Sequence, residues 1–372
     1  MKIFFDHKIF SLQSYGGPSR YFTNLVSKLN EIDSVNAKIY APLHINYMLS
    51  SISKSNIGIA NKIPFANFFN QSNNFKKSIL KINNKINKYY EKKEKPEIIH
   101  TTYYEDGFPK NSRNLVVTVY DLIHEIFKKD YSKEYKFLPK KNILDKAQQI
   151  ICISQSTKKD LINYYDIDEK KITVTYLSNN LTLDEKLFFK KKIKLPEKFF
   201  LYVGSRWKYK NFNQLLLSIS INKNILKELD LVIFGGGKIT SQEKEFIKRL
   251  NLNIDKIIQL DGDESLLKLL YRKAEFFIYP SKYEGFGIPI LESFSQKCPV
   301  LCSNTSSFPE VAGKAAIFFD PNDELSISNS IDSIMTSKDL RKKLINEGSE
   351  RLQKFSWTKC ASETLNVYKK IR

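Results

Sequence analysis

The sequence predicts an α/β protein of two domains, each built around a parallel β-sheet with helices on both faces. Short apolar runs alternate along the chain with longer stretches of helical spacing. One run, VVTVY at 116–120, is wholly apolar or β-branched, which is typical of a strand buried in a parallel sheet. The 372 residues suffice for two domains of ordinary size. Because ligands bind at the carboxyl ends of such strands, the loops that follow them are the candidate functional segments.

The composition indicates a folded protein with reduced cysteines. A hydrophobic content of 42%, with 13% aromatic residues, supports real cores and argues against disorder. The first ten residues are too short and interrupted for a signal peptide, and no run approaches the roughly 18 apolar residues of a membrane span. The four cysteines have no zinc-ligand spacing, and two lie in apolar runs. We therefore expect a cytoplasmic protein with reduced thiols.

The formal charge of +20 has two explanations. Abundant Lys, Asn and Ile indicate an AT-rich coding bias, which raises the lysine count without a functional reason. The functional alternative is an anionic partner, either a membrane leaflet or a nucleic acid. Within 75–95 the residues Phe75, Ile79, Ile82, Ile86 and Tyr89 recur at helical spacing among lysines. Peripheral docking at the inner face of the membrane and a solvated lysine face both fit this helix. No RNA-binding or helix-turn-helix signature supports a nucleic-acid partner.

The first predicted domain comprises residues 1–180. After its first strand, the glycines of the loop 13–20 precede a helix at 19–29 and favour close approach of the backbone to a ligand. Residues 41–95 are polar and offer few definite elements apart from the lysine-rich helix. A serine, Ser154 or Ser156, is expected to cap a helix that follows the fourth of the expected strands. These strands are 2–5, 98–100, 116–120, 150–154 and 172–176.

A polar, lysine-rich linker is predicted at 181–197, followed by a second domain at 198–354. The first strand of that domain leads into GSRWKYKN at 204–211, where glycine, basic residues and a helix start form a phosphate-binding turn in physical terms. A last segment, 355–372, contains a helix. The strands expected in the second domain are 199–203, 257–260, 276–279, 300–303 and 316–319, with a further strand and its turn at 231–237.

The segment 279–292, YPSKYEGFGIPILE, combines a strand end, a glycine-containing turn and a helix start. Proline at the second helical position suits a first turn, and the free N–H groups there form an anion site. Two carboxylates flank the site, Glu284 in the turn and Glu292 in the helix. Donors for a phosphate and acceptors for hydroxyl groups therefore lie in one short segment, which suits a sugar nucleotide. An ordinary strand-to-helix turn with a capping glutamate fits the spacing equally well.

The EGFGIPILE run resembles the Glu-x7-Glu segment of family-4 retaining glycosyltransferases, and CPVLCSNTSSFPEVAGKAAIFF at 298–319 is similar to the stretch that follows it in that family. The resemblance implies the GT-B fold, two Rossmann-like domains with parallel sheets facing across a cleft. It places Glu284 by the donor sugar and Glu292 on the nucleotide ribose. Backbone N–H groups of Phe286, Gly287 and Ile288 would face the sugar or diphosphate. It also implies that 355–372 crosses back onto the first domain.

The segment that begins at Gly204 resembles the YVG…RKN segment of the same family, whose Arg and Lys neutralise the donor diphosphate. Lys210 and Asn211 match directly, whereas Tyr209 replaces the usual arginine, so Arg206 is expected to supply that charge. Asp261 and Asp263 have the spacing of paired metal ligands, but in this family the position is a loop near the base. The resemblance implies neither a metal nor a cofactor.

In the first domain, Gly16 and Gly17 match the family's N-terminal glycine loop, with Arg20 a further candidate. Many family members carry His-Asp after the strand at 116–120, whereas here Asp121 precedes His124 by three residues. Either residue is a candidate for the reacting centre, and His100 is a weaker one. A structural histidine hydrogen-bonded to a nearby carbonyl is the alternative.

These observations predict a glycosyltransferase that moves a hexose, mannose first, from a GDP- or UDP-sugar to a saccharide or lipid-linked acceptor with retention of configuration. The resemblance to bacterial O-antigen and capsule mannosyltransferases supplies the sugar, the stereochemistry and the expected role in surface polysaccharide biosynthesis. Two alternatives stay open. A sugar-nucleotide epimerase can share the fold, and a basic binding protein without catalysis would explain the charge.

Overall fold

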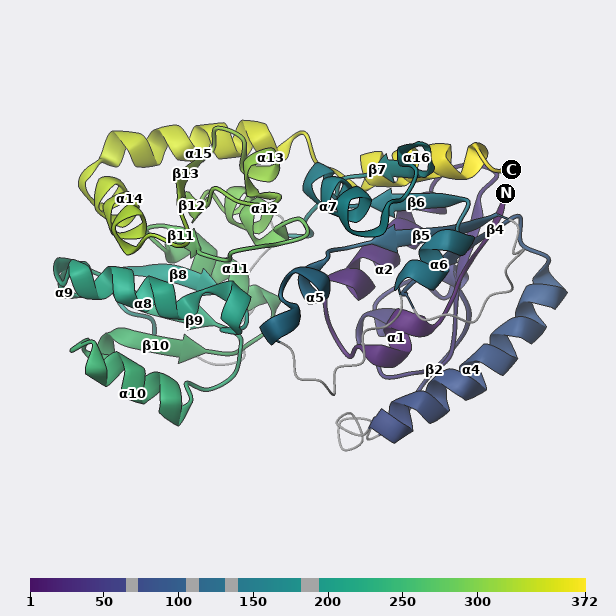
Figure 1. Cartoon of the computed structure of the whole chain (residues 1–372), viewed down its shortest axis with the longest axis horizontal. Helices are drawn as coiled ribbons and strands as arrows, with labels where there is room; N and C mark the ends of the chain where they lie inside the picture. Colours follow the sequence, from purple (N-terminus) through teal and green to yellow (C-terminus); the bar gives the residue numbers. More distant parts are fainter. Residues whose placement is uncertain (65–72, 105–113, 131–139, 182–193) are drawn as a thin grey trace. The chain divides into compact units, whose positions relative to one another are not determined.

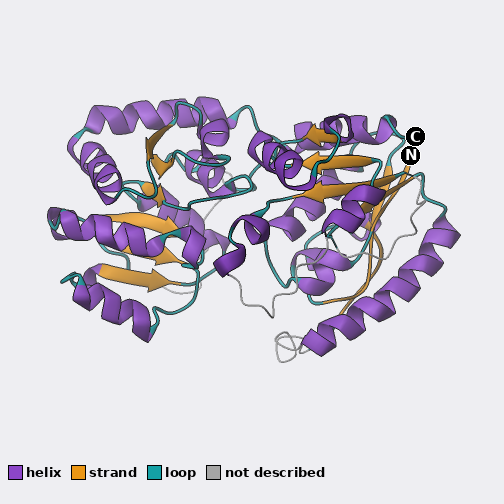
Figure 2. Cartoon of the chain, viewed as in Figure 1, coloured by secondary structure: helices purple, strands orange, loops and turns teal. Residues whose placement is uncertain are grey.

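The chain folds into two compact units, which a computed structural model describes over residues 1–64, 73–104, 114–130, 140–181 and 194–372 (Figure 1). The first unit consists of Met1–His124, Tyr131–Leu177 and Ser356–Arg372, and the second of Glu125–Asp130 and Ser178–Phe355. Each unit is an α/β domain with a single parallel sheet (Figure 2). The predicted linker 181–197 lies largely outside the described residues.

The first unit contains a seven-stranded sheet in the order β3-β2-β1-β4-β5-β6-β7. All of its strand pairs are parallel. The chain proceeds outward from β1 through β2 to β3 and then returns to β4 on the other side of β1, so the topological switch point lies between β1 and β4. The strands are β1 (Lys2–Phe5), β2 (Asn36–His44), β3 (Ile57–Lys62), β4 (Ile98–Thr101), β5 (Leu115–Val119), β6 (Gln149–Cys152) and β7 (Ile172–Val174).

Helices cover this sheet, and the wholly buried strand β5 confirms the expectation from its β-branched run. Ser154 caps the helix after β6, accepting a hydrogen bond from the N–H of Thr157, as the sequence predicts. The helices of this unit are α1 (Lys8–Leu12), α2 (Gly17–Leu29), α4 (Asn73–Glu94), α6 (Lys140–Lys146), α7 (Gln155–Tyr165) and α16 (Trp357–Lys369), with short 3₁₀ turns at Met48–Ser50, Lys54–Asn56 and Glu169–Lys171.

The second unit repeats the architecture with a six-stranded parallel sheet in the order β10-β9-β8-β11-β12-β13. Its switch point lies between β8 and β11, because β8, β9 and β10 run outward before the chain returns to β11. Buried aromatic and branched side chains fill the core, with Phe200 and Phe276 stacked at 5.1 Å. The strands are β8 (Phe199–Val203), β9 (Asp230–Phe234), β10 (Ile257–Leu260), β11 (Phe277–Tyr279), β12 (Val300–Ser303) and β13 (Ala316–Phe319).

The helices of the second unit follow its strands in regular alternation. They are α5 (Ile123–Ile126, which begins in the first unit), α8 (Phe212–Ile221), α9 (Asn224–Glu228), α10 (Ser241–Arg249), α11 (Glu264–Lys273), α12 (Ile288–Ser295), α13 (Phe308–Ala312), α14 (Glu324–Thr336) and α15 (Lys338–Leu352), with 3₁₀ turns at Lys128–Asp130, Lys208–Lys210 and Ile254–Lys256. Among the described helices, none has the length and apolarity that a membrane crossing requires.

The region 41–95 is more regular than the sequence indicates, since it contains β3, the end of β2 and the 22-residue helix α4. The apolar stripe of α4 is split. Ile79 is buried, whereas Ile82 and Tyr89 are 48% and 61% exposed. The inward face instead carries Asn83 and Asn87, which are buried.

The asparagines of α4 face inward because the backbone of β2 needs partners there. The register between β2 and β3 shifts between Ala41 and Leu43. Asn83 accepts a hydrogen bond from the Leu43 N–H at 2.9 Å and donates one to the Leu43 carbonyl at 2.7 Å. Asn87 donates to the Tyr40 carbonyl at 3.1 Å. Since unpaired buried backbone groups are costly, amide side chains replace aliphatic ones at this contact.

The C-terminal helix α16 belongs to the first unit, where it packs on α2. His100, in β4, links the middle of the first sheet to α16. Its Nδ1 lies 2.6 Å from the Tyr368 hydroxyl of α16, and its Nε2 lies 2.8 Å from the Thr118 hydroxyl of β5. Burial lowers the pKa of His100 to about 3. The weaker catalytic candidate is therefore a buried, neutral residue of the core.

Candidate functional site

The turn between β11 and α12 presents uncapped helix N–H groups, as the sequence predicts. Gly287 is the N-cap of α12 and has φ of 101°, in the left-handed region. A Cβ at this position would lie 3.3 Å from the Phe308 ring, so both the backbone angle and the packing favour glycine. No side chain is present at Gly287 to occupy the first N–H groups, and Pro289 follows within the first turn.

Two serines of the β12–α13 loop hold this turn in place. The Ser306 hydroxyl accepts a hydrogen bond from the Glu284 N–H and donates one to the Glu284 carbonyl, both at 2.9 Å. The Ser307 hydroxyl lies 2.9 Å from the Glu284 carbonyl and 2.8 Å from the Phe286 carbonyl. The backbone on both sides of Gly285 is therefore fixed by a neighbouring loop. Sequence reasoning assigned no role to these two serines.

Lys210 and Glu284 form an ion pair at the switch point of the second sheet. Lys210 ends the 3₁₀ turn after β8, and Glu284 lies in the turn after β11. Their Nζ and Oε1 atoms are 2.6 Å apart, and the side chains are 15% and 11% exposed. The Lys210 ammonium also lies 5.6 Å from the ring centroid of Tyr279. Two residues that the sequence singled out 74 positions apart thus share one partly accessible site.

A segment from between β5 and β6 packs against the two loops that carry this pair. Phe127 lies 5.7 Å from the Tyr209 ring and 6.4 Å from the Tyr283 ring, and the Lys282 N–H donates to the Tyr209 carbonyl at 2.8 Å. The aromatic residues beside Lys210 and Glu284 are therefore packed together. Sequence patterns gave no signal for Phe127.

Arg206 is more deeply buried and more fully hydrogen-bonded than its expected role as a diphosphate ligand suggests. Its Nε lies 2.6 Å from a Glu243 carboxylate oxygen, and its guanidinium also donates to the carbonyls of Gly235, Gly237 and Lys238 at 3.4, 3.1 and 3.0 Å. The side chain is 4% exposed. Gly236 permits the contact, since a Cβ there would come within 2.8 Å of the Gly204 carbonyl and 3.0 Å of the Arg206 Nη1. In this structure Arg206 fixes the β9–α10 loop through Glu243 and three backbone carbonyls.

The remaining donor-side candidates lie around the same sheet edge. Glu292 is buried within α12, and the Tyr271 hydroxyl donates to it at 3.4 Å. Gly204 directly follows β8, has φ of 123° and donates its N–H to the Phe234 carbonyl. The Asn211 side chain donates to the Pro321 carbonyl at 2.6 Å and is buried, which points to a structural function for its amide. Asp263 caps α11, and no cluster of potential metal ligands occurs in the described parts of the chain.

The candidate residues of the first unit lie in two segments, the start of α2 and the region around α5. Gly16 is the N-cap of α2, Gly17 begins that helix, and the Arg20 guanidinium hydrogen-bonds the hydroxyl of the exposed Tyr15. Asp121 accepts a hydrogen bond from the Ile123 N–H at 3.1 Å, which closes a turn before α5. His124 lies half-buried in α5.

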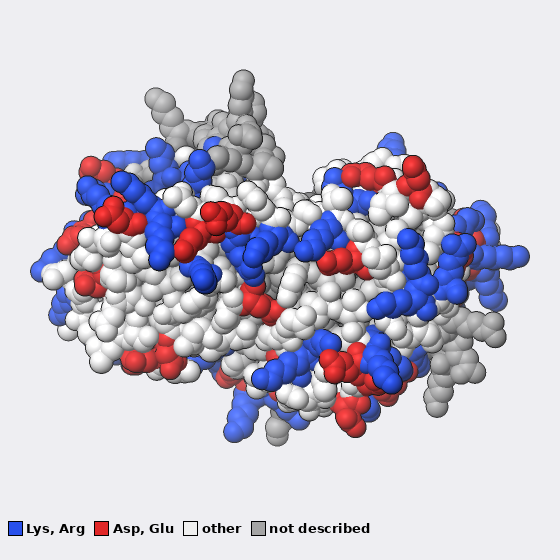
Figure 3. All heavy atoms as spheres, turned by 90° about the horizontal axis from the view of Figure 1, so that it is seen from above, with Lys and Arg blue, Asp and Glu red and all other residues white. Residues whose placement is uncertain are grey.

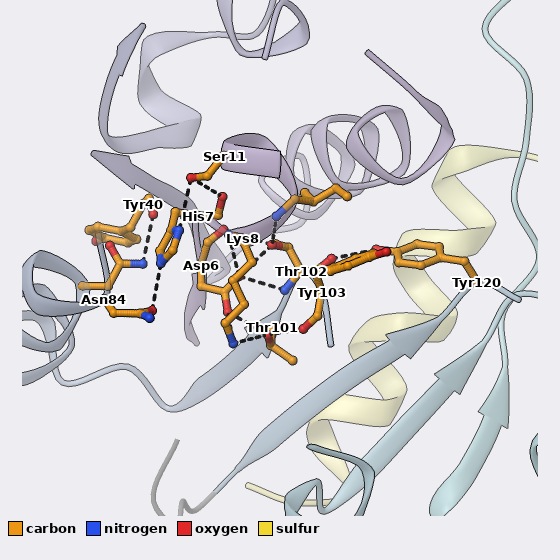
Figure 4. A network of polar contacts seen from close by, with 12 residues as sticks. Asp6, His7, Lys8, Ser11, Tyr40, Asn84, Thr101, Thr102, Tyr103 and Tyr120 are labelled. Atoms are coloured by element: carbon orange, nitrogen blue, oxygen red, sulfur yellow. Dashed lines mark hydrogen bonds and ion pairs between the residues drawn. The ribbon is translucent and has the colours of Figure 1, made fainter. Parts of the chain in front are cut away.

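A buried ion pair that the sequence did not indicate lies at the switch point of the first sheet (Figure 4). Asp6 and Lys8 follow β1 and are 3.2 Å apart, with side chains only 4% and 2% exposed. Thr101 and Thr102, at the end of β4, donate hydroxyl hydrogen bonds to the Asp6 carboxylate at 2.7 and 2.6 Å. Burial alone would raise the pKa of Asp6. Lys8, His7 and the threonine hydroxyls overcome this effect and lower it to about 2.

Comparison with known proteins agrees with the arrangement of two parallel-sheet units. The family model described as glycosyl transferases group 1 matches residues 184–351, and the model described as glycosyltransferase family 4 matches residues 15–178. The chain belongs to glycosyltransferase family 4. The first match covers the Lys210–Glu284 pair and the α12 turn, and the second covers most of the first unit.

Among relatives of this family-4 chain, O-antigen chain mannosyltransferase B from Escherichia coli is 30% identical over 235 residues, which are 61% of each protein. The N-acetylgalactosamine-N,N'-diacetylbacillosaminyl-diphospho-undecaprenol 4-alpha-N-acetylgalactosaminyltransferase of Campylobacter jejuni is 30% identical over 59% of this chain and 60% of its own length. Both matches thus span about three fifths of the relative. Anabaena Alr3699/HepE, solved in complex with UDP and glucose, matches with a TM-score of 0.67 over 99% of both chains at 13% identity. This likeness shows the GT-B fold.

Proposed function

We propose that this protein is a retaining hexosyltransferase that moves a sugar, mannose first, from a nucleotide-diphosphate sugar to an acceptor hydroxyl. The observation that carries the proposal is the Lys210–Glu284 pair in the second unit, where a cation and a carboxylate meet after β8 and β11. The family supports transfer of a glycosyl group. The geometry supports a site in which one side chain faces a phosphate and the other faces sugar hydroxyls.

Charge governs the proposed chemistry. As the bond between the anomeric carbon and the β-phosphate oxygen breaks, negative charge develops on the leaving diphosphate. In the proposal, the Lys210 ammonium and the N-terminal N–H groups of α12 stabilise that charge, and electrostatic stabilisation of this kind commonly contributes most to catalysis. The acceptor oxygen bonds to the same face of the anomeric carbon, and its proton passes to the leaving diphosphate. No enzyme base is required in this scheme.

The other candidate residues have supporting roles in the proposal. Glu284 would exchange part of its contact with Lys210 for hydroxyl groups of the donor sugar, while Glu292 would bind the ribose. The N–H groups of Phe286, Gly287 and Ile288 would contact the sugar or diphosphate. Gly16, Gly17, Asp121 and His124 are proposed for the first unit's part of the reaction. No metal ion or cofactor enters the scheme.

The names of two relatives support particular substrates. The name of the E. coli relative describes transfer of mannose in an O-antigen chain, which supports a GDP-mannose donor, with UDP-sugars as the next candidates. The C. jejuni relative is named for a diphospho-undecaprenol substrate, which supports a lipid-linked saccharide as acceptor. Such substrates would place the reaction in surface polysaccharide biosynthesis on the cytoplasmic side of the membrane.

A thermal-shift series with GDP, UDP, ADP and dTDP tests the donor half of the proposal. A ligand that binds only the folded state raises its stability by RT ln(1 + [L]/Kd), about 2.7 kcal/mol at 100-fold excess over Kd. We expect one diphosphate to raise Tm with concentration, and Lys210→Ala to weaken that shift. Lys208→Ala is the matched control, because Lys208 is exposed and pairs with Asp130 instead. Failure of all four nucleotides to shift Tm would contradict the proposal.

Product analysis separates transfer from the alternatives. With the stabilising nucleotide as its mannose or glucose conjugate, release of nucleotide should depend on a lipid-linked saccharide acceptor, and NMR of the product should show the anomeric configuration of the donor. Sugar isomerisation without acceptor would identify an epimerase. Nucleotide binding with no turnover against an acceptor panel would indicate a binding protein.

A further inference from the structure

The outer face of α4 carries a row of lysines that the proposed sugar-transfer site does not use. Lys81, Lys85, Lys88 and Lys92 follow one another at spacings of four, three and four residues, so they lie along one side of the helix. All are exposed. In the described part of the chain, none of the four forms an ion pair. The helix lies along the outer edge of the first unit (Figure 1).

Of the two carboxylates of α4, Glu91 lies close enough to Lys88 for that charge to oppose the rise of its pKa, and Glu94 pairs with a lysine outside the helix. Glu94 is half-buried and pairs with Lys2 at 3.6 Å, and Glu91 is half-buried with its pKa raised by burial. On the face shown in Figure 3 many basic side chains have acidic neighbours. Helix α15, for example, alternates cations with carboxylates and pairs Lys343 with Glu347 at 4.0 Å. A general lysine excess therefore does not account for the uniform sign of the α4 face.

Two large apolar side chains accompany the lysines. Ile82 and Tyr89, seven residues apart and thus on the same side of the helix, are 48% and 61% exposed. They are directed outward because Asn83 and Asn87 take the inward positions against β2. Exposed apolar groups bordered by lysines are the pattern of helices that lie in a membrane interface. A helix of 22 residues is about 33 Å long and presents the whole row to a flat surface.

We propose that the outer face of α4, defined by Lys81, Lys85, Lys88, Lys92, Ile82 and Tyr89, docks the protein on an anionic phospholipid bilayer. The lysines are attracted to acidic headgroups, and the Ile82 and Tyr89 side chains enter the boundary between headgroups and acyl chains. A nucleic acid would satisfy the lysines alone, because phosphate contacts do not require an adjacent apolar pair. The lipid surface accounts for both features.

Co-sedimentation of the full-length protein with vesicles tests the proposal. We expect binding to vesicles of phosphatidylcholine with 30% phosphatidylglycerol and little binding to phosphatidylcholine alone. Replacing the four α4 lysines by Gln should weaken binding at least about tenfold, since each lysine near an anionic surface contributes about 1 kcal/mol, or roughly fivefold. Replacing them by Arg should preserve it. The matched control replaces Lys338, Lys342, Lys343 and Lys354, which are also exposed, by Gln and should change binding less than twofold.

A second variant isolates the apolar part of the surface. Ile82→Ser with Tyr89→Ser should bind as wild type at low salt but release from vesicles at a lower salt concentration, because only its electrostatic attraction remains. Circular dichroism verifies that each variant is folded. Equal losses in the α4 lysine variant and in the control lysine variant would show that net charge alone drives binding and would overturn the proposal. Displacement of the protein from vesicles by an equal charge concentration of duplex DNA would also overturn it. Vesicle binding is measured without donor or acceptor, so its result is independent of the sugar-transfer proposal.

Discussion

The two units place a lysine–carboxylate pair at the same topological position, with opposite consequences. In the first unit Asp6 and Lys8 lie at the β1–β4 switch point, almost completely buried, and two threonine hydroxyls complete the shell around the carboxylate. In the second unit Lys210 and Glu284 lie at the β8–β11 switch point and keep part of their surface accessible. The first pair is sealed and stabilises a loop. The second keeps a small exposed fraction, as the proposed exchange of partners with a ligand would require.

The largest expected difference between the units is in their stability to acid. All four histidines of the sequence lie in the first unit, so acid should destabilise that unit more than the second. Burial lowers the pKa of His7 and His44 to about 4 and that of His100 to about 3. The unfolded chain therefore binds protons below pH 6.5 that the folded unit does not. Stability is fully present above this pH and is lost as the pH falls toward 4, at up to about 1.4 kcal/mol per pH unit for each histidine.

Tryptophan fluorescence reports on each unit separately. Trp357 belongs to the first unit and Trp207 to the second, and the sequence contains no other tryptophan. In urea titrations at pH 7 and pH 5, a Trp207→Phe variant should show a large loss of stability through Trp357. A Trp357→Phe variant should show a smaller loss through Trp207. Equal losses would mean that the units unfold together or that the histidines are not the cause.

Asp6→Ala should destabilise the first unit by about 3–5 kcal/mol, because it leaves the buried Lys8 ammonium without its partner. Urea unfolding followed through Trp357 measures the effect. Asp145→Ala is the control, since Asp145 forms an exposed pair with Lys141 at 3.5 Å and its loss should cost less than about 1 kcal/mol. Comparable effects of the two substitutions would remove the distinction between the sealed pair and a surface pair.

In contrast to Asp6→Ala, which should affect stability, Lys210→Ala should affect activity more than stability. We expect kcat to fall about 10²–10³-fold, or about 2.7–4 kcal/mol, because a charge that opposes the developing diphosphate is lost. The Lys210 and Glu284 side chains keep 15% and 11% exposure, against 2% and 4% for Lys8 and Asp6, so water can partly solvate Glu284 and the unfolding free energy should change less than in Asp6→Ala. Turnover assays and urea titrations of the same preparation decide the point. Unchanged kcat would remove Lys210 from the reaction.

Ser307→Ala should have the smallest effect on stability, about 1 kcal/mol, since the hydroxyl contacts two carbonyls of the β11–α12 turn. Nucleotide binding should weaken if the turn must be fixed for the α12 N–H groups to face the ligand. Ser333→Ala is a suitable control, because this hydroxyl donates within α14 to the Ser330 carbonyl at 2.9 Å. Wild-type nucleotide affinity in Ser307→Ala would show that the turn holds its shape without that hydroxyl.

The second unit was more predictable from sequence because its key features are encoded locally. Strand runs followed by glycine turns and a helix-starting proline locate Lys210, Glu284 and Gly287 at one sheet edge. The contacts of Arg206 were not predictable in this way. Its partner Glu243 forms a capping box at the start of α10, and that sequence pattern gives no sign of a distant arginine. Ser306 and Ser307 act across strands through common hydroxyl groups, for which spacing gives no signal.

The first unit was less predictable because long-range polar contacts decide which side chains turn inward. Helical periodicity placed Ile82 and Tyr89 on one apolar stripe with Ile79, but asparagines that satisfy the β2 backbone rotate the helix away from that arrangement. The pairing of Asp6 with Thr101 and Thr102 joins residues about 95 positions apart. His100 similarly depends on Tyr368, 268 residues later.

The contact between His100 and Tyr368 bears on how the protein is made. A ribosome releases β1 to β7 long before it reaches α16, yet that helix contributes the hydroxyl and the aromatic ring that cover His100 in the centre of the first sheet. The N-terminal half must therefore wait, incompletely packed, while the whole second unit is synthesised. Its last step of assembly therefore waits for α16, and nascent chains that lack Ser356–Arg372 should remain accessible to proteases and chaperones.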